Sequence, residues 1–258
     1  MNKWIVFISL IFFMFGCDGE GHLTKSNEPE RADNEKGNDY GLDKITLDPY
    51  IIEHYTRDAK QLYFHEIVQN SSHTDYDNPV LDEDEVTDIL RIIQAVYNMD
   101  THERDTVFDV YEIHGYYCYS FNSISLKVNT GLPEIQNLSN NIFPTRGTSL
   151  DNILNTYKFD SVQVSYSYPD FPWLTIFTKN EYNMVPIEKE FNKLSSVLIA
   201  EFSRGCIGDG NNITLERGSD SAVITFSIGY GDCPAGCIYH RYWEFRVSNG
   251  IAEFVKAY

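Results

Sequence analysis

The chain has 258 residues, of which 42% are hydrophobic and 14% aromatic. This apolar content is enough for one globular domain or two small ones, and it excludes disorder for most of the chain. The 38 acidic against 20 basic residues give a formal net charge of −18. Because an acidic chain repels a phosphate backbone, we expect no nucleic-acid partner.

The first 17 residues have the proportions of an export signal. Lys3 supplies a positive start, and an apolar run of twelve residues, 4–15, follows it. That run is shorter than the roughly 20 residues of a membrane-spanning helix, and its length is typical of a signal peptide. It ends at Gly16 and Cys17.

A small residue directly before a Cys at the end of the apolar run resembles the signal of bacterial lipoproteins. The resemblance implies that residues 1–16 are a signal peptide and that Cys17 is lipidated by diacylglyceryl and further acyl chains such as palmitate. Met14 departs from the family pattern, which favours Leu at that position. Several acyl chains anchor a protein stably, so the resemblance implies a cell-envelope protein on the outer membrane, at its periplasmic or surface face. The alternative is a secreted protein cut elsewhere, with Cys17 incidental.

A polar segment, residues 17–45, follows the signal. Between Asp18 and Lys44 its only large apolar residues are two Leu and one Tyr, too few to bury a core. We therefore expect a flexible tether that holds an ectodomain, residues 46–258, away from the membrane. The ectodomain is expected to be one α+β unit, with a division into two lobes near residues 130–148 as the alternative.

The N-terminal part of the ectodomain is predicted to be helical. Asp48 before a proline predicts a helix over 49–69, interrupted near Thr56. Asp82 and Glu85 form a capping-box pattern ahead of apolar residues at helical spacing. The acidic residues at this second start lie at the positive end of the helix dipole, which explains them without a metal.

From Thr106 onward the hydrophobic period shifts toward two, which predicts strands. Residues 217–220 and 248–250 have the composition of hairpin turns. The pattern therefore predicts an α+β fold, with N-terminal helices followed by a largely antiparallel β-meander. The expected strands are 106–114, 123–128, 161–166, 173–178, 197–203, 213–216, 222–228, 238–247 and 251–257, with short helices at 133–138 and 148–157.

Complete catalytic and metal motifs are missing from the sequence. Residues 65–69 begin like a zinc-protease helix, but Gln69 stands where the second His is required. Residues 75–78 begin like a calcium loop whose required Gly and Glu are absent. Residues 208–212 have the oxygens of a cation-binding turn, but a tight loop explains them more simply. We therefore expect no cofactor and no metal, and the protein is more consistent with a non-catalytic role.

The segment 231–237, Gly-Asp-Cys-Pro-Ala-Gly-Cys, is the most unusual in the chain. It resembles a block found in Bacteroidetes-type lipoproteins of no known activity, and the resemblance therefore implies no function.

Four cysteines remain after Cys17, an even number that indicates disulfides in an exported protein. We expect the pairs Cys233–Cys237 and Cys118–Cys206, with Cys206–Cys233 as the rival pairing. A metal site at Cys233, Cys237 and His240 is a further alternative, but it has no obvious fourth ligand.

Two groups of residues are candidates for ligand binding. His240, Tyr242, Glu244 and Arg246 alternate along one face of a predicted strand, which is either a site or the solvated face of a sheet. Tyr168, Phe171 and Trp173 form a patch in and beside a loop, suited to a glycan or a protein partner unless it is core.

These observations predict a lipid-anchored envelope protein that acts as a binding or structural module. Its expected partners are the membrane, through Cys17, and a glycan or an envelope protein. The alternative is an envelope hydrolase that uses carboxylates and His240, since acid–base catalysis needs two groups with separated pKa values.

Overall fold

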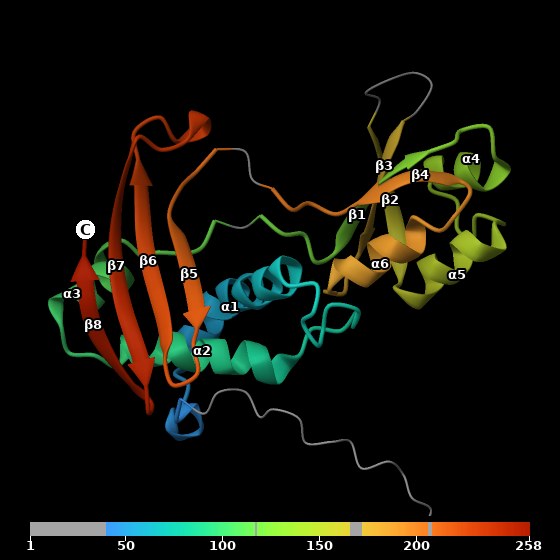
Figure 1. The fold of residues 1–258 in the computed structure, drawn as a ribbon. Helices are drawn as coiled ribbons and strands as arrows, with labels where there is room; N and C mark the ends of the chain where they lie inside the picture. The colour runs from blue at the N-terminus through green and yellow to red at the C-terminus, as the bar shows by residue number, and fades with distance from the viewer. Residues whose placement is uncertain (1–39, 117, 166–171, 206–207) are drawn as a thin grey trace, which may run out of the picture. The chain divides into compact units, whose positions relative to one another are not determined.

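The structure is a computed structural model that describes residues 40–116, 118–165, 172–205 and 208–258 (Figure 1). Contacts divide the chain into Met1–Lys36 and Gly37–Tyr258, and the second unit is the one described below. The predicted signal peptide, Cys17 and most of the predicted tether lie outside the described residues.

The described part is an α+β fold in which helices come first and strands dominate the end of the chain. Its α-helices are α1 (Pro49–Gln69), α2 (Glu83–Tyr97), α3 (His102–Asp105), α4 (Pro133–Ser139), α5 (Thr148–Thr156) and α6 (Met184–Phe191). Its strands are β1 (Ser123–Val128), β2 (Phe159–Ser165), β3 (Trp173–Thr178), β4 (Val197–Glu201), β5 (Asn212–Arg217), β6 (Ala222–Tyr230), β7 (Tyr239–Ser248) and β8 (Ile251–Ala257).

The strands form two antiparallel sheets. The order β5-β6-β7-β8 is the meander that the sequence predicts. The other sheet has the order β2-β3-β1-β4, so β1 lies inside it and pairs with two strands that come much later in the chain. A local hairpin pattern cannot specify such pairings, because they join segments separated by helices.

Helices α1 and α2 pack against the meander, α1 at β5 and α2 at β6, β7 and β8 (Figure 1). The second sheet has its own helices, with α4 and α5 against β2 and α6 against β4. The core of the first group contains Ile89 and Ile93 of α2 with Phe226 and Phe245 of the sheet, all fully buried. None of the described helices is both long and apolar enough to cross a bilayer.

Both long helices begin where the sequence predicts. The Asp48 carboxylate accepts a hydrogen bond from Tyr50 N at 2.8 Å, and α1 continues unbroken through Thr56. The interruption expected near Thr56 is wrong, because its hydroxyl bonds to the carbonyl one turn earlier within the helix. At α2 the Asp82 carboxylate accepts from the N–H two residues later, but Glu85 pairs with Arg217 rather than completing the capping box.

Two elements differ from the sequence prediction. Residues 106–114 are not a strand, because α3 continues into a π-helical turn, Thr106–Val110. Val107 and Phe108 are neighbours and both buried, which a half-buried strand does not allow. Helix α6 was not predicted; it contains a proline, which is tolerated in a first turn because those N–H groups have no partner in the helix.

The ordered ectodomain begins earlier than residue 46. Tyr40 and Leu42 are 2% and 6% exposed, although they belong to the predicted tether. The Tyr40 hydroxyl donates to the Gly218 carbonyl at 2.6 Å, and its own carbonyl accepts from Gly250 N at 2.5 Å. Tyr40 and Leu42 were assigned to the tether because isolated apolar residues carry little pattern, whereas the β5–β6 and β7–β8 turns supply the hydrogen-bond partners of Tyr40.

The alternative of two lobes divided near residues 130–148 does not match the path of the chain. The chain does not pass from one sheet to the other in that segment. That segment contains α4 and leads into α5, both of which belong to the sheet β2-β3-β1-β4. The chain enters that sheet through the segment before β1 and leaves it after β4. Those two connecting segments lie beside α1 and form part of the site described next.

Candidate functional site

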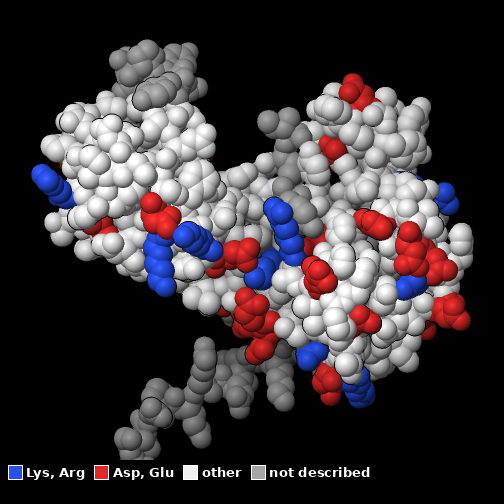
Figure 2. Space-filling model, turned by 180° about the vertical axis from the view of Figure 1, so that it is seen from behind, with Lys and Arg blue, Asp and Glu red and all other residues white. Residues whose placement is uncertain are grey.

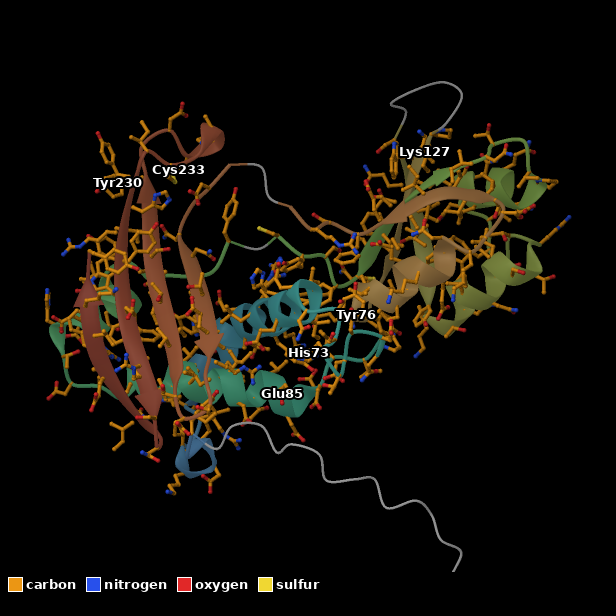
Figure 3. The ribbon with its side chains drawn as sticks, in the orientation of Figure 1. His73, Tyr76, Glu85, Lys127, Tyr230 and Cys233 are labelled. Carbon is orange, nitrogen blue, oxygen red and sulfur yellow. A yellow bond between two sulfur atoms is a disulfide. The ribbon has the colours of Figure 1, made fainter. Side chains whose placement is uncertain are left out.

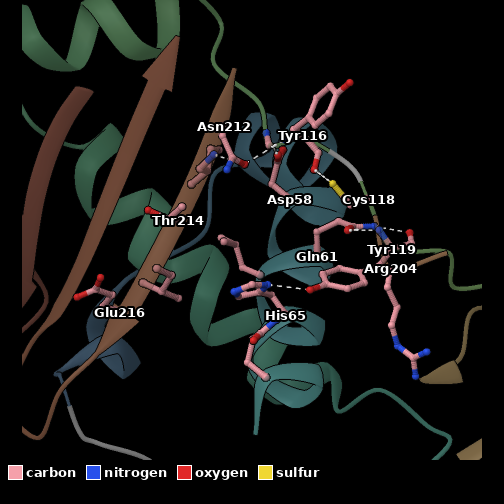
Figure 4. Close-up of a pocket in the computed structure, with 15 residues that line it drawn as sticks. Asp58, Gln61, His65, Tyr116, Cys118, Tyr119, Arg204, Asn212, Thr214 and Glu216 are labelled. Carbon is pink, nitrogen blue, oxygen red and sulfur yellow. Dashed lines mark hydrogen bonds between the residues drawn. The ribbon is translucent and has the colours of Figure 1, made fainter. Parts of the chain in front are cut away.

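A groove of about 580 Å³ lies between α1, the edge strand β5 and the two connecting segments (Figure 4). Its residues come from parts of the chain that are far apart in sequence. They are Asp58, Gln61, Leu62, His65 and Gln69 of α1, Gly115, Tyr116, Cys118, Tyr119 and Arg204 of the connecting segments, and Asn212, Ile213, Thr214, Leu215 and Glu216 of β5.

Gln61 and His65 hold the connecting segment onto α1. The buried Gln61 side chain donates to the Tyr119 carbonyl at 2.8 Å and accepts from Tyr119 N at 3.1 Å. His65 Nδ1 lies 2.8 Å from the Tyr119 hydroxyl, and the Tyr119 ring packs edge-on against Phe64. One wall of the groove is therefore fixed to one turn of α1 by three hydrogen bonds.

Asp58 is the buried acid at the end of the groove, 1% exposed. Its carboxylate accepts from His114 Nδ1 at 2.8 Å and from Gly115 N at 2.5 Å. The hydrogen bond that His114 donates to Asp58 raises the pKa of His114 above its usual range, although partial burial opposes this. The His114 ring stacks on Tyr55. This arrangement secures the chain where it leaves the π-helical turn.

The opposite wall is the backbone edge of β5. Within the described residues, β5 pairs with one strand, β6. Gly218 N donates to the Ser221 carbonyl at 2.9 Å, so this pair closes the β5–β6 hairpin as a hydrogen-bonded pair. Bonded and non-bonded pairs alternate in an antiparallel ladder, so Ile213 and Leu215 direct their N–H and C=O groups away from β6. Ile213 N donates to Asn212 Oδ1 at 2.9 Å.

The other face of the same sheet has a second hollow of about 560 Å³, lined by His240, Tyr242 and Glu244. The structure thus brings together three of the four residues predicted as a polar row, and Arg246 is exposed further along the strand. Tyr242 stacks on Tyr258, with ring centroids 4.9 Å apart.

His240 and Glu244 bind other partners rather than each other. His240 Nε2 lies 2.7 Å from Asp209 Oδ2, and Glu244 forms an ion pair with Lys256 of β8 at 3.3 Å. Hydrogen bonds from Gly210 N and His240 lower the pKa of Asp209, although burial opposes this. Four positions of strand place the Cα atoms of His240 and Glu244 about 13 Å apart, so the carboxylate that contacts His240 is that of Asp209. The hydrolase alternative stays a prediction.

The predicted aromatic patch is only partly described. Tyr168 and Phe171 lie outside the described residues. Trp173 begins β3 and is half-buried, on the face opposite the buried Leu174 and Ile176. The patch therefore stays a prediction.

The cysteine pairing is described at one bond. Cys233 and Cys237 form a disulfide, with Cα atoms 3.9 Å apart, so the rival pairing of Cys206 with Cys233 is wrong. Cys118 is also disulfide-bonded, but its predicted partner Cys206 lies outside the described residues, and that pairing stays a prediction.

Acidic and basic side chains lie next to one another over much of the face drawn in Figure 2. Among the described residues, Lys189 pairs with Asp77 and Arg204 with Glu188.

No protein-family model, curated protein or solved structure matches this chain, so its function is argued from geometry and sequence alone.

Sequence inspection missed the groove. Gln61 and Asp58 are polar positions within the buried stripe of α1, and that was the available signal. His65 is exposed but also contacts Tyr119. The edge of β5 cannot be recognised from side-chain types in the sequence, because it consists of backbone groups. Its position depends on which strand lies last in the sheet.

Proposed function

We propose that this chain is a lipid-anchored envelope protein whose ectodomain is a non-catalytic binding module for an extended peptide segment of another envelope protein. The observation that carries the proposal is that five consecutive residues of the edge strand β5 line the groove. Side chains on a strand alternate between faces, so a consecutive run means that the backbone edge itself borders the groove.

An extended peptide has the chemistry that this edge accepts. The C=O groups of Ile213 and Leu215 and the N–H of Leu215 face outward, at the two-residue spacing that a further antiparallel strand requires. Ile213 N already donates to Asn212 Oδ1 at 2.9 Å, so the free N–H on this stretch of the edge is that of Leu215. Strand addition gains its affinity from main-chain hydrogen bonds and its specificity from the side chains around the groove. Leu62 of α1 supplies apolar surface in the groove, and Tyr116 and Tyr119 supply aromatic surface in the wall opposite β5.

The anchoring part of the proposal is supported by sequence. The N-terminus resembles a lipoprotein signal in Lys3, the apolar run and the Gly16-Cys17 junction. The polar segment that follows has the composition of a flexible linker between the anchor and the ectodomain. An anchored module close to the membrane meets envelope proteins at high effective concentration, so even weak peptide binding becomes significant.

The test is a selection of short random peptides against the full chain, followed by affinity measurement with two variants. Leu215→Pro removes one outward N–H and leaves the β5–β6 bonds in place. Leu215→Ala keeps that N–H and controls for the lost side chain. We expect affinity to fall about tenfold or more in Leu215→Pro relative to Leu215→Ala.

N-methylated peptides provide a second readout that does not depend on the folding of a variant. Methylation at alternate amides should abolish binding in one register and be tolerated in the other, because only one set of amides faces β5. Equal affinity for both methylation registers, equal affinity of the two Leu215 variants, or a selection that yields no binder overturns the peptide proposal.

A further inference from the structure

Three side chains that can bind a metal converge at the end of the β6–β7 hairpin. Asp209, Cys237 and His240 each offer a ligand atom within 4.8 Å of the others. Cys233 is bonded directly to Cys237 and lies at the same end of the hairpin (Figure 3). Sequence inspection considered the two cysteines with His240 and found no fourth ligand, which the structure supplies as Asp209 from the loop before β5.

Hydrogen bonds hold the Asp209 loop on the cysteine turn. Asp209 N donates to the Cys233 carbonyl at 2.9 Å, and the Asp209 carboxylate accepts from Cys237 N. His240 Nε2 completes the contacts of that carboxylate at 2.7 Å. The Asp, His and Cys groups are therefore positioned by protein contacts alone.

Two glycines let backbone approach the cysteine turn closely. A Cβ at Gly229 would lie 2.5 Å from Cys237 Sγ, and one at Gly208 would lie 2.7 Å from the Cys233 carbonyl. Gly208 also has a φ of +85°, which side-chain-bearing residues rarely adopt. At both positions the backbone therefore lies closer to the cysteines than a residue with a Cβ would allow.

We propose that reduction of the Cys233–Cys237 disulfide creates a tetrahedral Zn²⁺ site whose ligands are the two Sγ atoms, His240 Nε2 and the Asp209 carboxylate. Two thiolates, one imidazole and one carboxylate are all ligands that zinc takes in four-coordinate sites. The Cys-x₃-Cys spacing lies within the range of zinc-binding cysteine pairs. This inference is independent of the proposed peptide groove, because none of the four ligand residues lines it.

The geometry requires local rearrangement. Tetrahedral zinc with bonds of about 2.0–2.3 Å separates its ligand atoms by about 3.3–3.8 Å. The bonded sulfurs must part to that distance, and Cys233 Sγ, which is not part of the 4.8 Å group of Asp209, Cys237 and His240, must turn toward His240 and Asp209 after reduction. The 2.7 Å contact between His240 and Asp209 must open slightly. The metal ion then replaces the hydrogen bond between these two side chains.

The redox chemistry balances with a dithiol reductant. The dithiol gives two electrons and two protons to the protein disulfide and becomes a disulfide itself, leaving the thiols of Cys233 and Cys237. Zinc binding then releases those two protons, because the thiolates are its ligands. In the oxidised protein neither sulfur is a thiolate, so the site is closed to metal.

The test is titration of the anaerobically reduced full chain with Co²⁺, a spectroscopic substitute for Zn²⁺. We expect one equivalent to bind with a tetrahedral, thiolate-type spectrum and to be displaced by Zn²⁺. The oxidised chain should give no such spectrum. Zn²⁺ should also protect Cys233 and Cys237 from alkylation, as read by mass spectrometry.

Four variants separate this site from other thiols and carboxylates. Cys237→Ser should abolish the spectrum, and Asp209→Asn and His240→Gln should each weaken Co²⁺ binding about tenfold or more. Cys118→Ser controls for the other disulfide, which reduction also opens, and should bind like the wild type. Less than stoichiometric binding, an octahedral spectrum, loss in Cys118→Ser, or unchanged binding in Asp209→Asn or His240→Gln overturns the four-ligand site.

Discussion

Arg217 at the end of β5 forms a two-bond ion pair with Glu66 of α1. Its Nε donates to Glu66 Oε1 at 2.9 Å, and its Nη2 donates to Glu66 Oε2. Its third donor, Nη1, reaches Glu85 of α2 at 2.7 Å. Burial disfavours the charged form, but hydrogen bonds and charge from Glu66 and Glu85 outweigh this and raise the pKa of Arg217.

Replacing Arg217 with Met should lower the free energy of unfolding by about 2 kcal/mol, between the values for exposed and buried ion pairs. The loss arises because two half-buried carboxylates are left without their cation. Arg217→Lys should lower the free energy of unfolding by a smaller amount, but it should not be neutral, since an ammonium group cannot make the forked contact with Glu66. Urea unfolding measures both, and a change within about 0.5 kcal/mol for Arg217→Met would contradict this role.

Replacing Cys17 with Ser should move the protein from the membrane fraction to the soluble fraction. The reason is that Ser cannot carry the thioether-linked lipid, and no described helix can replace that anchor. Fractionation followed by immunoblotting measures the shift. Cys118→Ser is the matched control and should stay with the membrane; unchanged partitioning of Cys17→Ser would refute the anchoring proposal.

The Asp58–His114 contact should make stability depend on pH. Because Asp58 raises the pKa of His114 in the folded state, the pair stabilises the fold fully below the unfolded His pKa of about 6.5, and this contribution is lost as pH rises through the folded value. Urea unfolding at a series of pH values should show wild-type stability falling over that window relative to His114→Gln. The exposed His54→Gln is the control and should retain the wild-type slope; parallel wild-type and His114→Gln curves would rule the linkage out.

Gly250→Ala should destabilise the protein by about 1–2 kcal/mol. Asn249 and Gly250 have φ values of 51° and 75°, as a type I′ hairpin turn requires. A Cβ on Gly250 would also lie 2.8 Å from the Gly41 carbonyl oxygen. Gly205→Ala, where a Cβ meets nothing within 4 Å, is the control. Equal melting temperatures for the two variants would show that the turn does not hold the N-terminal segment.

Local sequence signals predicted much of the fold. The Asp48 and Asp82 caps, the Asn249-Gly250 turn and the Cys233–Cys237 bond each join residues that are at most four positions apart. Such contacts depend on spacing and on the conformational preferences of a few neighbouring residues, which the sequence displays directly. The alternating strands of the β5–β8 meander were found for the same reason.

The tertiary structure alone decided the groove, the partners of the acids and the N-terminal boundary. Glu85 looked like half of a capping box, yet it binds Arg217, which is 132 positions away. Asp209 looked like a loop residue, yet it lies 2.7 Å from His240, which is 31 positions away. The sequence by itself determined the elements and their caps, because these depend on near neighbours. Which strand forms an edge and which side chains meet across it depend on packing between distant segments, and no local pattern encodes that.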